Sequence, residues 1–402
     1  MRRLLALCLA GALLAGCSGG SKATETPAAK ASDKPVELTL YAPTMAIRRE
    51  ALDDAIEAYT NKHPNTKIRV RELPMGQMVT PDGKFNTGTI DSGDLVLVPD
   101  AQALALHKEG KLRDLSSVRI SQLNDLAAPL FDELGKQDGK RYGLPFNITP
   151  STMMVNQDAL EQAGLKMPPV DWTVQEFEQI VTTLKAKGAN YQLSLNFLLD
   201  PLVRAFGGQM YDTAKQAWAF DTSEAKQGLT FVGRLTKAGI LQADQNGGKV
   251  TIMIGKGPGA PALTALPGAL QVAMPGMTLL PFPKGPGGRS VQASAQVGAV
   301  LNTSANPEAA TDFLKELVSS PAMQLAMAKG GIRPMMGDTK AMAAWQEAVG
   351  DKTAQAIELS LDGAYVGNNN VKMQDAMTGL EPFFSGKATL DEVVPSLIAR
   401  LQ

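Results

Sequence analysis

The sequence predicts an α/β fold in two lobes, and three observations support that expectation. The folded part of the chain opens with a strand, a helix and two further strands, an order typical of a mostly parallel sheet covered by helices. The third strand, Asp94–Val98, is an almost unbroken apolar run, as in strands that are buried on both faces. About 365 residues follow the first 35 residues, which is more than one typical domain.

The opening elements follow from hydrophobic spacing. Val36–Tyr41 alternates enough to predict the first strand. Apolar residues then recur at helical spacing through Arg48–Lys62, and Pro64 ends that helix. Lys67–Leu73 is the second strand of the predicted sheet.

Later elements are predicted in the same way. Thr173 is placed to cap a helix and Glu176 stands at the capping-box position. We expect further strands at Leu193–Leu198, Val250–Ile254 and Val297–Leu301. Further helices are expected at Ser223–Ala238, Pro307–Ser319, Ala341–Ala348, Asp375–Phe383 and Leu390–Leu401.

The first residues predict export. Arg2 and Arg3 precede the apolar stretch Leu4–Leu14, which is shorter than the roughly 20 residues of a membrane span. A basic start and a short apolar stretch describe a signal peptide. The tetrapeptide that ends at Cys17, Leu-Ala-Gly-Cys, resembles a bacterial lipobox, which implies a signal peptide over residues 1–16 and a lipid on Cys17. Residues 17–35 lack large apolar side chains and are expected to form a flexible tether.

Composition excludes several classes of function. The formal charge of −1 becomes −3 without Arg2 and Arg3, which argues against nucleic acid as a partner. Cys8 leaves with the signal peptide and Cys17 takes the lipid, so no disulfide is expected. Only His63 and His107 are available as histidines, and no Cys/His cluster predicts a metal site. No cofactor is expected.

No enzyme motif stands out. The loop Gly255–Gly259 lacks the third glycine of a dinucleotide fingerprint and the Gly-Lys-Ser/Thr of a P-loop. No Gly-x-Ser-x-Gly elbow is present. A paired-carboxylate glycosidase stays open, because Asp and Glu are plentiful. We predict a protein that is not an enzyme.

Motifs in a fixed order carry a resemblance that covers essentially the whole body of the chain. It resembles the extracellular solute-binding proteins of family 1, the maltose-binding-like components of ABC importers. The opening strand–helix–strand and the second-lobe and closing segments all match in the family's order. The matching segments are Val36–Val70, Tyr142–Phe146, Asn156–Leu165, Phe206–Gly208, Gly248–Met253, Asn306–Leu314 and Ser385–Val393.

The resemblance implies a periplasmic-binding-protein-like fold of class II, in which each lobe is a mostly parallel sheet flanked by helices. The two lobes would be connected by a hinge, with the ligand in the cleft between them, and would close on binding. The chain would cross between lobes near residues 143–150, 283–295 and 330–335. Lobe 1 would then comprise residues 36–145 and 290–332, and lobe 2 residues 146–289 and 333–402.

The implied function is the binding component of an ABC importer. It would be a monomer anchored by lipid on the extracytoplasmic face of the cell membrane, delivering a small polar solute, expected to be a carbohydrate, to a permease. A lipoprotein that reports a ligand to a membrane kinase is an alternative. Aromatic residues form only 5% of the chain, which favours a small ligand over a long stacked glycan and leaves a polyamine open.

Candidate ligand-binding residues follow from a rule of open α/β sheets, in which ligands bind beyond the carboxyl ends of strands. Polar and aromatic side chains at these ends and at the lobe crossings suit a polar ligand. Arg333 has an interlobe salt bridge as its alternative role, and Asn369 a solvated turn. The candidates are Tyr41, Thr44, Gln77, Asp100, Asn147, Phe197, Asp200, Arg333 and Asn369.

Overall fold

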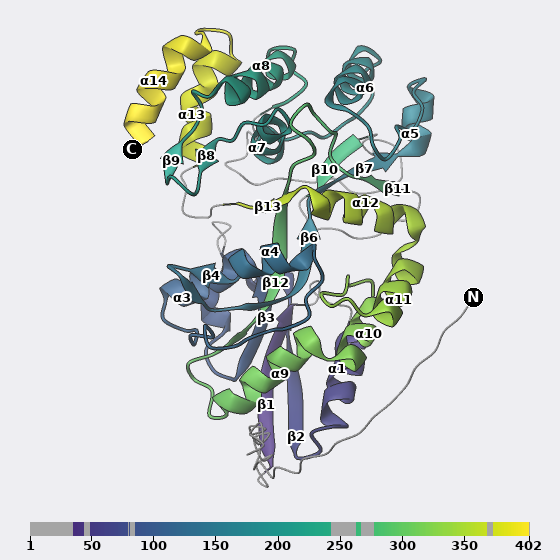
Figure 1. Ribbon diagram of the computed structural model, residues 1–402, viewed down its shortest axis with the longest axis vertical. Helices are drawn as coiled ribbons and strands as arrows, with labels where there is room; N and C mark the ends of the chain where they lie inside the picture. Colours follow the sequence, from purple (N-terminus) through teal and green to yellow (C-terminus); the bar gives the residue numbers. More distant parts are fainter. Residues whose placement is uncertain are drawn as a thin grey trace, which may run out of the picture. The chain divides into compact units, whose positions relative to one another are not determined.

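The computed structural model describes residues 35–43, 49–78, 80, 85–242, 263–266, 277–367 and 373–401. Both helices and strands occur throughout these residues (Figure 1). The buried apolar side chains form two separate hydrophobic cores, one for each lobe. The α/β, two-lobed fold class that the sequence predicts is confirmed.

The sheet of the first lobe has the order β13-β12-β3-β1-β2, and β6 also pairs with β12. Strand β1 runs parallel to β2 and β3, as predicted. Strand β12 runs antiparallel to β3 and β6, so the sheet is more mixed than the sequence indicates. The strands are β1 (Val36–Pro43), β2 (Thr66–Leu73), β3 (Leu95–Pro99), β6 (Leu144–Pro150), β12 (Val291–Val300) and β13 (Ala364–Val366).

Helices cover this sheet with their apolar faces. In the first helix, Ala51, Leu52, Ala55 and Tyr59 are buried at helical spacing. The helices are α1 (Arg49–Thr60), the short α2 (Met75–Met78), α3 (Asp100–Lys108), α4 (Ala127–Glu133), α9 (Pro307–Ser319), α10 (Pro321–Lys329), α11 (Thr339–Val349) and α12 (Asp351–Asp362). A 3-10 turn, Thr87–Thr89, and the hairpin β4 (Lys136–Gln137) and β5 (Lys140–Arg141) complete the lobe.

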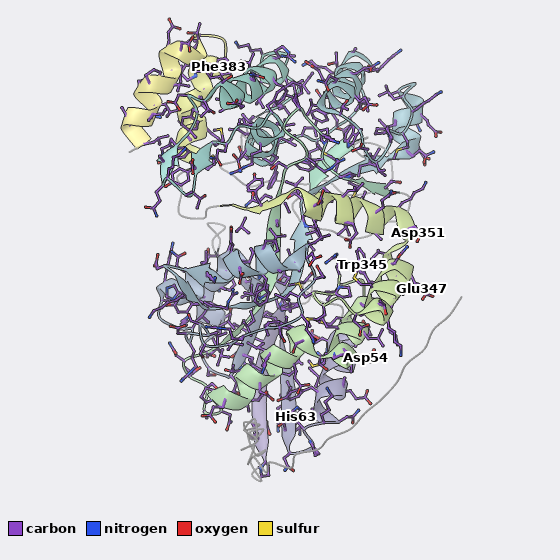
Figure 2. All side chains as sticks on the ribbon, in the orientation of Figure 1. Asp54, His63, Trp345, Glu347, Asp351 and Phe383 are labelled. Carbon is purple, nitrogen blue, oxygen red and sulfur yellow. The ribbon has the colours of Figure 1, made fainter. Side chains whose placement is uncertain are left out.

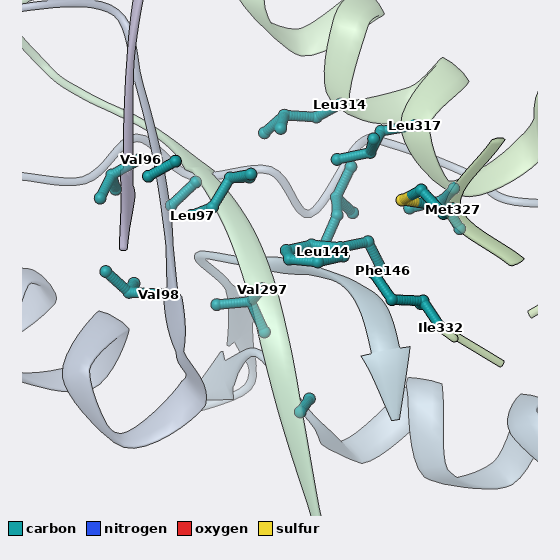
Figure 3. Close-up of a cluster of buried hydrophobic side chains, with 14 of the residues drawn as sticks. Val96, Leu97, Val98, Leu144, Phe146, Val297, Leu314, Leu317, Met327 and Ile332 are labelled. Atoms are coloured by element: carbon teal, nitrogen blue, oxygen red, sulfur yellow. The ribbon is translucent and has the colours of Figure 1, made fainter. Parts of the chain in front are cut away.

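The first core forms where these helices meet the sheet. Every residue from Leu95 to Val98 is fully buried, as the apolar run predicts. Figure 3 shows Leu97 of this run on the side that faces Leu314 of α9. Gly298 of β12 makes that approach possible, because a Cβ there would lie 2.4 Å from Leu314 Cδ2. Each large apolar side chain buried in this way contributes about 1.5–3 kcal/mol of hydrophobic stabilisation.

The second lobe is built on a small antiparallel sheet of order β10-β7-β11, so the mostly parallel sheet predicted for this lobe is wrong for the described strands. Its strands are β7 (Thr152–Asn156), β10 (Leu263–Leu266) and β11 (Met277–Leu280). Its helices are α5 (Gln157–Gln162), α6 (Val174–Ala186), α7 (Leu195–Ala205), α8 (Ser223–Lys237), α13 (Met373–Phe384) and α14 (Leu390–Leu401), joined by the hairpin β8 (Tyr211–Asp212) and β9 (Ala217–Trp218).

The second core is centred on Trp172, which is fully buried and donates a hydrogen bond from Nε1 to Pro281 O at 2.8 Å. The predicted capping box is confirmed, because Thr173 and Glu176 exchange both of its hydrogen bonds at the start of α6. Figure 2 labels Phe383 on α13, which belongs to this core, and Trp345 on α11, which belongs to the first core.

The last third of the chain contributes to both cores. Met335, Trp345 and Ile357 pack in the first core, beyond the predicted crossing at residue 332. From Ala376 onward the buried residues belong to the second core. The lobe boundaries given above stay a prediction.

One predicted element is wrong. Leu193–Leu198 was expected as a strand because it is apolar, but α7 begins at Leu195. The Ser194 side chain accepts a hydrogen bond from Asn196 N at 3.2 Å and caps this helix. The apolar residues then recur on one helical face, so the short run continues into a longer helical pattern.

Several predictions fall outside the described residues. These are the signal peptide, Cys17, all of the tether except Pro35, and the strand Val250–Ile254. Among the residues that are described, none of the helices has the length and apolar character needed to cross a bilayer.

Candidate functional site

A pocket of about 360 Å³ lies on α7 of the second lobe, where β12 and β13 meet it. Polar and aromatic side chains form most of its wall. The lining residues are Asn196, Phe197, Asp200, Pro201, Arg204, Tyr211, Thr213, Gln292, Tyr365, Val366, Gly367 and Met373.

Helix α7 lines this pocket with one of its two faces. One face is apolar and buried, and the other is polar and aromatic. Leu195, Leu198, Leu199 and Leu202 are buried in the second core. Phe197, Asp200 and Arg204 are spaced three and four residues apart, so they share the other face. The core therefore fixes the helix and leaves this polar and aromatic stripe to face the pocket.

Asp200 and Arg204 form an ion pair within the pocket. Arg204 Nε donates to Asp200 Oδ2 at 2.9 Å, and Asp200 Oδ1 accepts from Met210 N at 3.2 Å. Burial lowers the pKa of Arg204, but Asp200 and Tyr365 together more than offset this, so the pKa lies above its ordinary value. The pocket therefore contains a carboxylate whose charge is already compensated.

Tyr365 of β13 reaches the same pair. The Arg204 guanidinium lies 4.0 Å from the centre of the Tyr365 ring. Burial raises the pKa of the Tyr365 phenol well above its ordinary value, and the Asp200 carboxylate raises it further. The phenol thus stays protonated, and its hydroxyl already interacts with the Asp200–Arg204 pair.

Asn196 carries an unsatisfied polar atom in the pocket wall. Its Oδ1 is buried and has no hydrogen-bond partner, although the side chain as a whole is half-buried. Buried polar atoms in native proteins are nearly always paired, so an exception calls for an explanation. Asn196 is also one of the residues that line the pocket.

Strand β12 extends the polar lining away from the pocket. Its side chains alternate, and Gln292, Ser294 and Gln296 share one face while Ala293 and Ala295 share the buried other face. Ser294 pairs with Thr149 of β6, and their hydroxyl oxygens lie 3.5 Å apart. From Gln292 to Gln296 this polar face runs about 13 Å along the strand.

Gln296, at the far end of that face, has two other amide side chains on neighbouring elements, Asn147 and Gln102. Gln296 pairs with Asn147 across β6 and with Pro99 across β3, and Gln102 follows Pro99 in the first turn of α3. Gln102 Oε1, Asn147 Oδ1 and Gln296 Oε1 are all buried without a hydrogen-bond partner. We call these three side chains, together with Asn196, the unpaired amides.

A β-bulge lies at the same place. The register of β12 against β6 shifts between Gln296 and Val297. Bulges re-aim side chains and are over-represented beside functional sites. The register shift thus falls directly beside the Asn147–Gln296 pair.

Of the predicted site residues, three lie in this region. Phe197 and Asp200 line the pocket, and Asn147 is one of the unpaired amides. Thr44 and Asn369 lie outside the described residues. Gln77 is exposed on the short helix α2.

The remaining three predicted residues make their hydrogen bonds within the protein. The Tyr41 hydroxyl donates to Asp91 Oδ1 at 3.1 Å and accepts from Arg71 Nη1 at 2.8 Å. Asp100 Oδ1 accepts from Gly135 N at 2.9 Å. Arg333 pairs with both carboxylate oxygens of Glu358, at 2.6 and 3.0 Å.

Sequence reasoning missed Asn196, Arg204, Gln292, Gln296 and Tyr365. Two signals in the sequence point to some of them. The helical spacing of Phe197, Asp200 and Arg204 is visible once the segment is treated as a helix. The alternation of Gln292, Ser294 and Gln296 with alanines predicts a strand with one polar face.

A second hollow, of about 540 Å³, lies beside α4 and the β4–β5 hairpin. Its most buried charged lining residue, Arg141, donates to the carbonyl oxygens of Leu134 and Phe131 at 2.9 and 2.8 Å. None of the buried unpaired side-chain atoms belongs to its lining. The pocket of about 360 Å³ on α7 is therefore the better candidate for the functional site.

Comparison with known proteins gives a family match over residues 42–324, to the family described as bacterial extracellular solute-binding protein. A lactose-binding protein of Rhizobium radiobacter is 27% identical over 171 residues, which cover 40% of this chain and 39% of that protein. The chain spans between 34% and 52% of the length of the curated relatives it matches.

Solved structures agree in fold. An ABC substrate-binding protein of Listeria monocytogenes in complex with cycloalternan is 17% identical, with a TM-score of 0.66 and coverage of 92% of this chain and 98% of that one. A cyclic α-maltosyl-1,6-maltose binding protein of Arthrobacter globiformis is 18% identical, with a TM-score of 0.67 and coverage of 91% and 98%.

Proposed function

The chain belongs to the bacterial extracellular solute-binding proteins, and from this premise we propose that it is the substrate-binding component of an ABC importer for a small neutral carbohydrate. The observation that carries the choice of ligand is the set of unpaired amides, one of which, Asn196, lines a charge-compensated pocket. The lactose-binding relative and the two sugar-binding structural neighbours support the same class of ligand.

The hydrogen-bonding chemistry of the site suits a polyhydroxylated ligand. Each sugar hydroxyl can donate one hydrogen bond and accept others. The buried amide atoms of Asn196, Asn147 and Gln296 need such partners, because leaving each one unpaired costs about 1–3 kcal/mol. A ligand rich in hydroxyls would remove that cost on binding and gain affinity from it.

The electrostatics favour a neutral ligand over a polyamine. Asp200 is the only carboxylate in the described lining of the pocket, and Arg204 already pairs with it. A polyamine would bring a positive charge next to that guanidinium, and like charges at close range repel. This is why we prefer a sugar to the cationic ligand that the sequence left open.

Aromatic surface and volume set the size of the ligand. Phe197 and Tyr211 line the pocket, and aromatic faces pack well against the apolar face of a sugar ring. A volume of about 360 Å³ lies near the lower end of the roughly 300–1,000 Å³ of ligand pockets. The described lining therefore suits a mono- or disaccharide better than a long glycan.

The same lining gives no support to glycoside hydrolysis. That reaction uses two carboxyl groups on either side of the scissile bond. Asp200 has no second carboxylate with it among the described lining residues. We therefore propose a carrier that releases its ligand unchanged to a permease.

Anchoring belongs to the same proposal. The lipobox-like sequence that ends at Cys17 supports a lipid anchor on the outer face of the membrane. Cell fractionation tests it: the wild-type chain should sediment with membranes, and the Cys17→Ser variant should not be lipid-modified. Equal lipid labelling of both chains would contradict it.

A thermal-shift screen tests the ligand class. Sugars, polyamines and amino acids are added singly to the purified protein, since a ligand that binds the folded state raises the melting temperature. We expect a mono- or disaccharide to raise it and spermidine to leave it unchanged. Recovery of the sugar intact after incubation excludes turnover. A shift with spermidine and none with any sugar would overturn the choice of ligand.

A further inference from the structure

A second cluster of polar side chains lies in the first lobe, apart from the ligand pocket. His63 follows the end of α1 (Figure 2), and Asp312 and Glu316 lie on α9. Their possible ligand atoms all lie within 4.8 Å of one another. Asp312 and Glu316 are four residues apart, so both side chains project from the same face of the helix.

The distances are close to those of a metal site. His63 Nε2 lies 2.7 Å from Glu316 Oε1 and 4.0 Å from Asp312 Oδ2. Zinc binds imidazole nitrogen and carboxylate oxygen at about 2.0–2.2 Å, which puts two tetrahedral ligands about 3.4 Å apart. The His63–Glu316 pair would open by under 1 Å and the His63–Asp312 pair would close by a similar amount. Small side-chain rotations are enough for both changes.

Tyr59 orients two of the three side chains. Its ring stacks on the His63 imidazole, with ring centres 4.1 Å apart and planes 18° from parallel. Its hydroxyl donates to Asp312 Oδ2 at 3.3 Å. Tyr59 is itself buried, and its ring packs edge-on against Phe313 at 5.1 Å. Outer partners that fix the orientation of ligands in this way are a regular feature of metal sites.

Lys62 is a positively charged neighbour that could repel a bound cation. Its Nζ lies 3.4 Å from Glu316 Oε2 and 3.2 Å from Ser320 Oγ. It therefore contacts the carboxylate oxygen that His63 does not contact, and Glu316 Oε1 stays available as a single-oxygen ligand. The Lys62 side chain is 52% exposed, so it can also move into solvent when a cation binds.

We propose that His63, Asp312 and Glu316 form a binding site for Zn²⁺ or a similar divalent transition-metal ion, and that the ion joins the end of α1 to α9. One imidazole and two carboxylates favour such ions over Mg²⁺ and Ca²⁺, which prefer all-oxygen ligands. Asp312 is about half exposed and water can complete the coordination shell. This site does not depend on the identity of the transported ligand.

The composition of the chain allows a clean test. It contains two histidines and two cysteines in all. We use the full chain with Cys8→Ser and Cys17→Ser, in mild detergent, so that no thiol competes for zinc. His107 supplies the matched control, because its ring also stacks on a tyrosine, Tyr142, with ring centres 3.6 Å apart. His107→Gln therefore removes a stacked histidine outside the proposed site.

Calorimetric titration with ZnCl₂ should give one site per chain, and zinc should raise the melting temperature. Loss of an outer partner alone typically costs about 10- to 100-fold in metal affinity, so His63→Gln should cost at least that much. Asp312→Asn and Glu316→Gln should weaken binding too, and His107→Gln should not. Circular dichroism of each variant without zinc checks that the fold is intact.

A spectroscopic readout identifies the ligand atom. The two histidines give two sets of imidazole ¹⁵N signals, which His107→Gln assigns. We expect zinc to shift the Nε2 signal of His63 and to leave His107 unchanged. Absence of zinc binding would mean that the cluster is an ion pair only, and binding that survives His63→Gln would place the ion elsewhere. Either result overturns the proposal.

Discussion

Two groups of buried polar side chains in this molecule differ in whether their hydrogen-bonding atoms have partners within the protein. Tyr41, Asp100 and Arg333 in the first lobe have their hydrogen bonds completed by neighbouring protein groups. Asn147, Gln296 and Asn196 leave a buried amide atom without any partner. Completed hydrogen bonds stabilise the fold, whereas an unpaired atom costs stability until something binds it. We propose that the difference separates side chains that stabilise the fold from side chains that bind a ligand.

The largest expected effect comes from breaking a completed interaction. In Arg333→Met the Glu358 carboxylate loses its bidentate partner in the first lobe. Breaking a buried pair costs about 3–5 kcal/mol, but Glu358 is 34% exposed, so we expect a loss of about 2–3 kcal/mol in the free energy of unfolding. Urea unfolding measures this change. Sugar affinity should stay within about twofold of wild type, and a selective loss of affinity would instead place Arg333 in the ligand site.

Replacing one of the unpaired amides should have a smaller effect, and this effect should be on sugar affinity and not on stability. Asn196→Leu keeps the approximate shape and removes the hydrogen bond to ligand, so affinity for the sugar should fall roughly 5- to 30-fold, or about 1–2 kcal/mol. Stability without ligand should be equal or higher. Calorimetry and thermal unfolding measure the two quantities.

Asn124→Leu is the matched control for that variant. Asn124 Oδ1 accepts from Ala127 N at 2.9 Å, and its Nδ2 donates to Pro334 O at 3.1 Å. Losing these bonds should lower stability and leave affinity unchanged. If the two asparagine variants behave alike, the distinction between completed and unpaired side chains is wrong.

The smallest effect concerns pH. Burial raises the pKa of Asp100 above its ordinary value, although the Gly135 N–H and Arg141 partly oppose this. A group whose pKa is raised by folding favours the folded state below its ordinary pKa of about 3.8, and that contribution is lost as pH rises through the raised pKa. Asp100→Asn keeps an acceptor for Gly135, so the variant should be slightly more stable than wild type at pH 7.

That advantage should shrink as the pH falls below 7 and the wild-type carboxyl becomes protonated. Melting temperatures of both chains across this range provide the measurement. A variant that is less stable at pH 7 and recovers at low pH would show that the Asp100 charge contributes favourably to the fold.

The sequence predicted the fold well where local patterns are strong. Pro307–Ser319 and Leu390–Leu401 have the bounds that were expected, and Thr173 caps its helix as expected. Leu193–Leu198 failed because a short apolar run has no period that separates a buried strand from a helix face. Phe197 and Asp200 thus line the pocket from a helix, although they were chosen as the end of a strand.

The site itself was predicted only in part, for two physical reasons. Arg204, Gln292 and Tyr365 come from elements up to 161 residues apart in the sequence, and only the packing of β12, β13 and α7 brings them together. Whether a polar side chain is paired also depends on its three-dimensional neighbours. Asp100 and Asn147 therefore look equally suitable as ligand contacts in the sequence, and their surroundings differ in the folded chain.

A crystal structure with the bound sugar tests the central claim most directly. We predict that amide atoms of Asn196, Asn147 and Gln296 each lie about 2.7–3.2 Å from a sugar hydroxyl or from a water that bridges to one. A sugar bound elsewhere, with these three amides left as they are or paired only to other protein groups, would contradict the account.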